Sequence, residues 1–400
     1  MPKLAAMSGR PRLYFADALL EYDFGRGHPM APHRVRLTLD LAAELGVLDQ
    51  LDVVDPSVPE GELLLGVHTP PYIAAVRAAG ADPDAADERF GLGGSDNWAF
   101  RGMHESSLAI ASASVDGALA IQRGETLHAL NLMGGLHHAM PSHASGFCIY
   151  NDAALAIRAL LDAGAERVAY VDTDAHHGDG VEAIFADDPR VLTISLHESP
   201  MTLFPGTGRV GDIGGPAALG SAVNVPLPAG TGDAVWWRAF GAIVPPLVRA
   251  FAPTVLVSQH GADGHGLDPL THLDLSVDVQ RAAAVVLHDL AHEVTGGRWL
   301  VLGGGGYATV DVVPRAWTHL VAIAAEHPLA PETATPQGWR DRVSEEFSRS
   351  APAAMTDGRQ DVLDSVAAFS DAYDPADPVD QTILQVQHAV FPYHGVPVDW

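Results

Sequence analysis

Residues 167–180 read RVAYVDTDAHHGDG, an apolar run followed by three aspartates and two histidines. Short apolar runs of this kind are typical of the buried strands of a parallel sheet. Carboxylates and imidazoles ordinarily lie on solvated faces, but here they follow directly where a buried strand should end. The segment therefore predicts a strand that delivers reactive side chains to its carboxyl end.

Similar apolar runs, each ending in a polar or glycine-rich turn, occur at 128–139, 190–198, 254–263 and 298–307. Between them lie Ala- and Leu-rich stretches of helical length, such as 151–164, 235–251 and 279–294. Strands that alternate with helices predict an α/β fold with a parallel sheet. We expect one catalytic domain over residues 1–325, and a Pro-rich C-terminal extension over 326–400 that packs on the core or trails from it.

The composition excludes several classes of protein. The 400 residues are 47% hydrophobic and carry a formal net charge of −27, which disfavours direct nucleic-acid binding because that relies on Lys and Arg against phosphates. With Cys148 as the single cysteine, neither an intramolecular disulfide nor a Cys-rich zinc site is possible. No signal-peptide pattern and no run of the ~20 apolar residues that span a bilayer is present. We expect a soluble, cytoplasmic protein that does not bind membranes.

Reactive side chains recur at the ends of several of these runs. His137 and His138 follow the first, Asp263 ends another, and Tyr307 comes after four glycines. In open α/β sheets, ligands bind outside the carboxyl ends of the strands. These separated segments therefore predict one shared site.

The residues that follow the apolar run 167–172 are suited to bind a metal ion. Side chains alternate across an extended strand, so Asp174 and His176 would point to one face and bind an ion together, with Asp172 in support. Asp263 could complete the set. Two carboxylates and one imidazole with open positions suit catalytic Zn²⁺ or Fe²⁺ better than a closed structural site. The alternative is a polar cluster satisfied by its own hydrogen bonds.

Proton transfer has candidates as well. The unperturbed pKa of a histidine such as His137 or His138 lies near neutral pH, and a carboxylate can fix the orientation of each ring, with Asp172 and Asp179 as the natural partners. The hydroxyl of Tyr307 could stabilise a developing oxyanion. A structural histidine pair is the alternative. The glycines lack the G-x-G-x-x-G spacing of a dinucleotide site, so we do not expect a nucleotide enzyme.

Seven ordered segments resemble the zinc-dependent histone deacetylase family, close to its class I pattern. They are EYDFGRGHPMAPHR, GGLHHA, ASGFCIYND, YVDTDAHHGDG, FPGTG, VNVP and LGGGGY. Further segments are similar to the bacterial acetoin utilization branch of that family, namely DGHGLDPLTHL, FRGMHE, TPQGWRDRV and APAAMTDG. The resemblance runs from about residue 14 to about residue 325. It implies an arginase-like α/β fold with a central parallel sheet of about eight strands. It also implies hydrolysis of Nε-acetyl-lysine in proteins to lysine and acetate.

The resemblance further implies a role for each residue of the site. The zinc ligands would be Asp174, His176 and Asp263. The main general base would be His138, oriented by Asp179, with His137 beside it, oriented by Asp172, and with Tyr307 polarising the acetyl carbonyl. The substrate would contact Asp96 at the rim, Gly146, Phe147 and Phe204 along a tunnel, and Arg34 near an inner acetate cavity. A structural potassium ion would lie near Asp172, Asp174, His176, Ser195 and Leu196.

Three departures and three alternatives accompany this resemblance. Ala31 stands where nuclear class I enzymes carry a lysine that helps to bind inositol phosphate. Gly178 and His265 stand where two-metal arginases carry metal-binding aspartates, which favours one ion over two. The alternative functions are an acetylpolyamine amidohydrolase, a catalytically inactive acetyl-lysine-binding module and a two-metal hydrolase. Among acetylated protein substrates, the branch points to metabolic enzymes such as acetyl-CoA synthetase.

Overall fold

Eight parallel strands form the centre of the computed structural model, which describes residues 9–56 and 63–399. Their order across the sheet is β2-β1-β3-β8-β7-β4-β5-β6. The predicted α/β fold with a parallel sheet of about eight strands is therefore confirmed. The strands are β1 (Arg12–Tyr14), β2 (Asp52–Val54), β3 (His128–Asn131), β4 (Val168–Asp172), β5 (Val191–Glu198), β6 (Ala222–Leu227), β7 (Val255–Gln259) and β8 (Trp299–Leu302).

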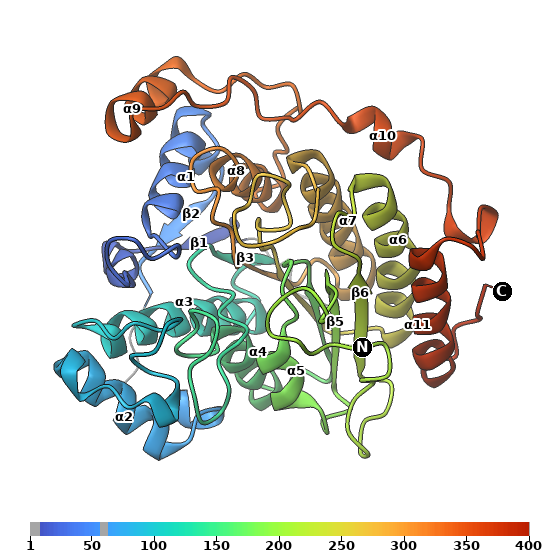
Figure 1. The fold of residues 1–400 in the computed structure, drawn as a ribbon, viewed down its shortest axis with the longest axis horizontal. Coiled ribbons are helices and arrows are strands. Elements are labelled where there is room, and N and C mark those ends of the chain that lie inside the picture. Colours follow the sequence, from blue (N-terminus) through green and yellow to red (C-terminus); the bar gives the residue numbers. More distant parts are fainter. Residues whose placement is uncertain (1–8, 57–62, 400) are drawn as a thin grey trace.

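Helices cover both faces of this sheet (Figure 1). Helices α1, α8, α7 and α6 lie side by side on one face, and α3, α4 and α5 lie on the other. The bounds are α1 (His33–Glu44), α2 (Pro70–Ala81), α3 (Met103–Gln122), α4 (Asp152–Asp162), α5 (Asp179–Phe185), α6 (Asp233–Phe251), α7 (Val277–Thr295), α8 (Val313–Ala324), α9 (Gln337–Phe347), α10 (Gln360–Asp364) and α11 (Pro378–His394). Short 3₁₀ helices span Asp17–Glu21, Leu48–Gln50, Leu63–Gly66, Pro83–Ala85, Glu88–Phe90 and Phe369–Asp371.

The central strands are buried on both faces, as their continuous apolar sequences predict. Every residue of β3, β4, β7 and β8 is buried. These four strands are neighbours in the sheet, and because all run parallel, their carboxyl ends meet at one edge. The segments that follow them hold His137, His138, Asp174, Asp263 and Tyr307. The fold thus brings the predicted reactive residues to a single region.

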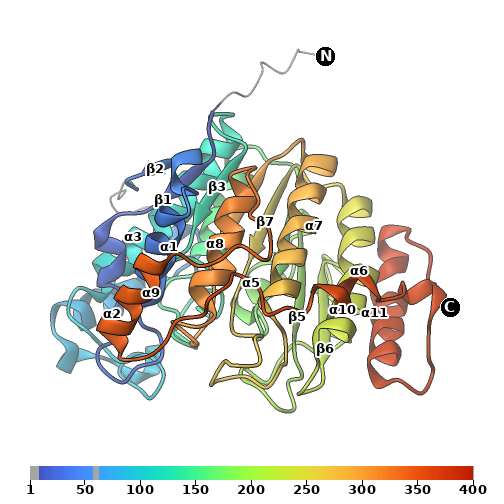
Figure 2. The same cartoon turned by 90° about the horizontal axis from the view of Figure 1, so that it is seen from above.

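The C-terminal segment runs along the outside of the helices of one face (Figure 2). Helix α9 contacts α1, the short α10 contacts α6 and α7, and α11 packs on α6 and on the edge strand β6. The proposed division at residue 325, directly after α8, stays a prediction. No helix in the described ranges combines the length and the hydropathy that crossing a membrane requires.

Two contacts, the first of them buried, fix this segment to the core. The side chain of Trp339 is 0% exposed, and its Nε1–H donates to the carbonyl of Leu37 at 3.0 Å. Farther along, the carboxylate of Asp357 accepts from the guanidinium of Arg315 at 2.8 Å and pairs with Nε2 of His265 at 2.9 Å. Burial works against the ionised form of Asp357, but His265 and Arg315 outweigh it and keep its pKa well below the ordinary range.

Replacing Trp339 by alanine should lower the free energy of unfolding by about 3–5 kcal/mol, because it empties a fully buried aromatic site between α9 and α1. The midpoint of urea unfolding, followed by circular dichroism, measures the change. Trp98→Ala is the matched control, since that ring is 39% exposed and should cost much less. Equal midpoints for the two variants would show that α9 adds little to stability.

Candidate active site

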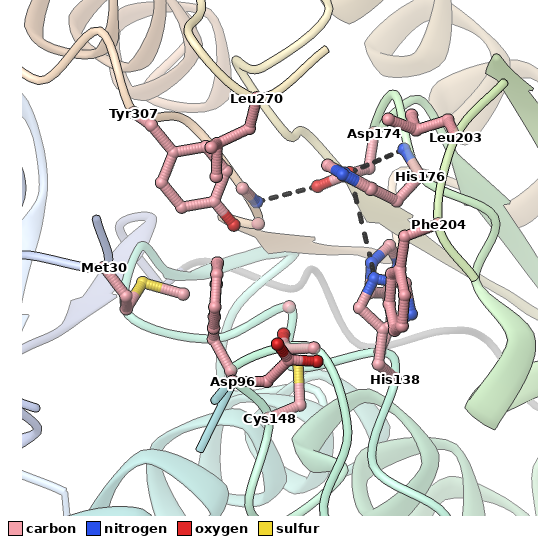
Figure 3. A pocket seen from close by; sticks show the side chains of 16 residues that line it. Met30, Asp96, His138, Cys148, Asp174, His176, Leu203, Phe204, Leu270 and Tyr307 are labelled. Carbon is pink, nitrogen blue, oxygen red and sulfur yellow. Dashed lines mark hydrogen bonds and ion pairs between the residues drawn. The ribbon is translucent and has the colours of Figure 1, made fainter. Parts of the chain in front are cut away.

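A cavity of about 230 Å³ opens at the carboxyl edge of the sheet (Figure 3). Tyr307 and Leu270 stand on one side of it, and His138 and Phe204 stand across from them. The lining residues are Met30, Asp96, Gly135, His137, His138, Gly146, Phe147, Cys148, Asp174, His176, Leu203, Phe204, Leu270, Gly304, Gly305 and Tyr307. The cavity therefore combines an apolar wall with a floor of carboxylate and imidazole groups.

Asp174, His176 and Asp263 lie together at the floor. One ligand atom from each lies within 4.8 Å of the others, so the three can hold a metal ion. Nδ1 of His176 is 3.1 Å from Oδ1 of Asp174 and 2.9 Å from Oδ2 of Asp263. The predicted set is thus brought together, from the segments after β4 and β7.

The way in which Asp174 and His176 converge differs from the expected alternation along a strand. Strand β4 ends at Asp172, and residues 174–176 form a bend. Oδ1 of Asp172 accepts the backbone N–H of Asp174 at 3.1 Å, and Oδ1 of Asp174 accepts that of His176 at 3.0 Å. Two successive aspartate turns therefore aim the ligands, because aspartate readily bonds the backbone two residues ahead.

The charges at the floor favour a cation. Asp174 and Asp263 are buried together beside one imidazole, and both are 0–1% exposed. Burial and the neighbouring charge of Asp174 raise the pKa of Asp263 to about 7. Two buried carboxylates that repel each other in this way are stabilised by a bound positive ion. A divalent metal fits this donor set.

Two histidine–carboxylate pairs stand next to these ligands. Nδ1 of His137 is 2.7 Å from Oδ2 of Asp172, and Nδ1 of His138 is 2.7 Å from Oδ1 of Asp179. The two Nε2 atoms are 3.1 Å apart. Asp172 is itself held by the hydroxyl of Tyr170 at 2.8 Å. Each ring is thus oriented by the carboxylate that the sequence predicted for it.

The two imidazoles differ in protonation. Burial opposes the charge on His137, but the carboxylates of Asp172 and Asp174 outweigh it and raise the pKa to about 9. Burial, followed by the charge on His137, lowers the pKa of His138 to about 4. One ring is therefore charged and the other neutral at pH 7. A neutral ring beside a cavity is the state that a general base requires.

Close packing and backbone conformation both require the glycines before Tyr307, since Gly304 and Gly306 have φ values of 144° and 141°. A Cβ on Gly305 would lie 2.1 Å from Oδ2 of Asp263. The N–H of Gly305 instead donates to Oδ2 of Asp174 at 2.7 Å. The backbone thus passes directly over the two carboxylates. The N–H of Tyr307 donates to Oδ2 of Asp268 at 2.7 Å, which fixes the start of the next segment.

The walls of the cavity are aromatic. The ring of Phe147 packs edge to face on Tyr307 with centroids 5.7 Å apart, and that of Phe204, 42% exposed, packs on His138 at 5.0 Å. A Cβ on Gly146 would lie 2.4 Å from Cδ2 of His138, so only glycine fits there. These three residues therefore line the cavity as predicted.

Asp96 and Arg34 occupy opposite ends of the site. Asp96 is exposed, and its backbone carbonyl accepts from Nε2 of His28 at 2.9 Å, which holds the rim. Arg34 is buried behind Tyr307, and its guanidinium donates to the carbonyl of Gly306 at 3.0 Å. Arg34 thus braces the backbone beside the cavity.

Neither Gly178 nor His265 offers a ligand for a second ion. A Cβ on Gly178 would lie 2.4 Å from Oδ2 of Asp172, so no side chain fits there. His265 points to the C-terminal segment, where it pairs with Asp357. Both observations agree with a floor built for one metal ion.

Sequence reasoning missed several supporting residues. It gave no role to Asp268, Leu270, Met30 or Leu203, although Leu270 and Asp268 lie in the segment DGHGLDPL, 263–270. The only signal for Asp268 was an acidic residue on the loop that follows a buried strand. Its function of holding the N–H of Tyr307 depends on a contact 39 residues away in sequence.

Comparison with known proteins agrees with this geometry. Residues 28–324, which make up most of the chain, match the family model of the histone deacetylase domain. The chain belongs to the histone deacetylase family. It is 41% identical to the acetoin utilization protein AcuC of Bacillus subtilis over 82% of this chain and 89% of that protein. It is 36% identical to AcuC of Staphylococcus xylosus, over 88% of this chain and 91% of that protein.

Membership of the histone deacetylase family confirms the recognised resemblance and the fold, and it makes the protein a hydrolase of the deacetylase type. A third relative, AcuC of Staphylococcus aureus strain Mu50, is 37% identical over 80% of this chain and 83% of its own length. These relatives are named for acetoin utilization.

Proposed function

We propose that the protein removes the acetyl group from Nε-acetyl-lysine in proteins, using one bound Zn²⁺ or Fe²⁺ ion. The observation that carries this proposal is the joining of three features at one cavity. They are the ligand set Asp174, His176 and Asp263, the neutral His138, and the hydroxyl of Tyr307 on the facing wall. Metal-assisted hydrolysis of an amide uses this combination of an ion, a base and an oxyanion donor.

Asp174, His176 and Asp263 would hold the ion, which when bound supplies Lewis-acid activation of the carbonyl and of water. Two buried carboxylates, one with a raised pKa, and one imidazole match that requirement in charge and in donor type. The Gly305 N–H keeps the carboxylate of Asp174 in place during the reaction.

His138 would carry the protons. It is neutral, and Asp179 holds its Nδ1–H, so its Nε2 is the basic atom and accepts a proton from the attacking water. His138 then returns that proton to the lysine nitrogen as the amide bond breaks. His137, charged beside Asp172, has its Nε2 3.1 Å from Nε2 of His138 and would stabilise the negative charge that develops on the oxygen of the tetrahedral intermediate.

Tyr307 would stabilise the oxyanion. Burial, followed by the charges of Asp263 and Asp174, raises the pKa of Tyr307 well above its ordinary value, so its hydroxyl keeps its proton and can donate it. Phe147 and Phe204 would contact the four-carbon stem of the lysine, and the exposed Asp96 would accept from its backbone N–H. An aromatic passage of this kind suits an unbranched apolar chain.

We also propose that a structural potassium ion binds beside β4, at Asp172, Asp174, His176, Ser195 and Leu196. Two observations support the location. Asp172 pairs in register with Ser195 on β5, and the N–H of Glu198 donates to the carbonyl of Ala175 at 2.9 Å. The turn after β4 thus lies along β5, where backbone carbonyls can converge on a monovalent cation.

Acetate release from an acetyl-lysine peptide and from an N-acetylpolyamine, compared as kcat/KM for the zinc-loaded protein, tests the substrate. We expect the peptide to be preferred by about tenfold or more, because only a peptide backbone can use Asp96. Asp96→Asn should narrow that preference, and Asp23→Asn, also exposed, serves as the control.

Preference for the polyamine would show that the proposed peptide substrate is wrong, but it would leave the catalytic assignments unchanged. An acetylpolyamine amidohydrolase is the second candidate, and the net charge of −27 favours it because polyamines are cations. Release from neither substrate with metal bound would favour an acetyl-lysine-binding module. If the peptide is preferred, acetylated acetyl-CoA synthetase is the cellular substrate that we propose to test next, because the resemblance to the bacterial acetoin utilization branch implies acetylated metabolic enzymes as substrates.

A further inference from the structure

A second group of metal-ligating side chains lies away from the cavity. It consists of His128, His288, His292 and Glu326, and one ligand atom from each lies within 4.8 Å of the others. His128 is the first residue of β3, whereas the active-site histidines follow the end of that strand. The group, called here the His128 cluster, therefore lies at the amino edge of the sheet, opposite the candidate active site.

Three separate elements deliver the His128 cluster. His288 and His292 are four residues apart near the end of α7, so they share one face of that helix. Glu326 follows the end of α8 and lies 3.6 Å from Nε2 of His292. The imidazole of His128 is close to both helical histidines, with ring centroids 5.2 and 5.1 Å away.

Two of these rings have an unused nitrogen. The Nδ1–H of His128 donates to the carbonyl of Ala324 at 2.6 Å, so its Nε2 carries a lone pair. Within the described chain, that buried Nε2 and the buried Nε2 of His288 have no hydrogen-bond partner. His128 is 0% exposed, so water cannot readily satisfy it. Nδ1 of His288 is held by Asp289 at 3.3 Å.

This pattern is the one that metal-binding histidines adopt. One ring nitrogen donates to a carbonyl or carboxylate and the other faces the ion. An aromatic cluster around Trp299 would explain the ring contacts at 5.6 and 5.8 Å, but it leaves both lone pairs unpaired.

We propose that the His128 cluster is a second metal site, which binds a borderline divalent ion of the Zn²⁺ class through three imidazoles and one carboxylate. Four protein ligands make a closed site, so the role is structural. The ion would tie together the start of β3 and the ends of α7 and α8. This inference does not rest on the proposed deacetylase chemistry.

Small side-chain movements would complete the geometry. Tetrahedral zinc at about 2.0–2.1 Å from each ligand brings ligand atoms to about 3.4 Å from one another. The side chains of His292 and Glu326 are 38% and 54% exposed, so they have room to move toward the ion. His128 and His288 already face the site from the protein interior.

Zinc titration of the metal-stripped, full-length protein by calorimetry tests the proposal. We expect the wild type to bind a second zinc equivalent that His288→Ala/His292→Ala lacks, with kcat of the zinc-loaded variant unchanged. Zinc should raise the Tm of wild type more than that of the double variant. His388→Ala, an exposed histidine on α11, is the matched control and should retain every zinc.

Two further variants separate this site from the active site. Asp174→Asn should lose the active-site zinc and keep the zinc of the His128 cluster, with its rise in Tm. Glu326→Gln, a mild change at an exposed side chain, should weaken only the cluster site by about tenfold or more. Equal zinc stoichiometry and equal affinity in wild type, Glu326→Gln and the double variant would overturn the proposal, whatever the active site binds.

Discussion

His138→Ala should lower kcat for acetyl-lysine hydrolysis by about 10²–10⁴-fold, the usual contribution of a positioned acid–base group. His138 is the neutral imidazole of the cavity, and Asp179 fixes its Nδ1 at 2.7 Å. The loss should fall on kcat and leave KM nearly unchanged, because the Phe147 side of the cavity still binds substrate. Steady-state kinetics on an acetyl-lysine peptide measures it.

The control for this variant is His143→Ala, which removes an exposed imidazole five residues along the same segment. Its kcat should match that of wild type. Zinc content, measured by elemental analysis, should be equal in all three proteins, so that lost activity reflects proton transfer alone. A His138→Ala enzyme with at least half of the wild-type kcat would remove His138 from the mechanism.

Asp174→Asn should weaken metal binding at the active site by about 100-fold or more and abolish turnover with it, because it removes one of two carboxylate ligands. Asparagine keeps the size of the side chain and an oxygen for the N–H of Gly305, so the fold should persist. Metal content after dialysis, together with kcat at a fixed zinc concentration, measures the effect.

Asp361→Asn provides the comparison, since Asp361 is an exposed carboxylate on α10. It should bind metal and turn over like wild type. If Asp174→Asn bound zinc as tightly as this control and kept its activity, the ion would be held elsewhere. The assignment of Asp174, His176 and Asp263 as the catalytic ligands would then be wrong.

The central strands and the grouping of the site were predictable because both depend on local pattern. Continuous apolar runs give β3, β4, β5, β7 and β8, and parallel strands share an edge, so polar residues that follow them must meet. Strands β1, β2 and β6 escaped this reasoning, and β2 and β6 are the two edges of the sheet. β1 and β2 have three residues each, and β6 contains Pro226, which strands rarely tolerate.

The rest of the site depends on contacts between distant residues. The turn after Asp172 replaces the expected extension, because the side chains of Asp172 and Asp174 accept the backbone N–H groups two residues ahead of them. The His128 cluster could not be predicted either. His128 and His288 lie far apart in the sequence, although their rings are in contact in the structure. A single histidine in an apolar stretch does not indicate which residues it will contact.

His265 and Asp268 lie on one loop, and they face different neighbours. His265 holds Asp357 of the C-terminal segment, and Asp268 holds the N–H of Tyr307. The C-terminal segment and Tyr307 are thus attached to the same short piece of chain. A substitution in this loop should therefore affect both the position of the C-terminal segment and that of Tyr307. A tail exchanged between relatives would need the matching loop histidine, so these distant residues should be inherited as a set.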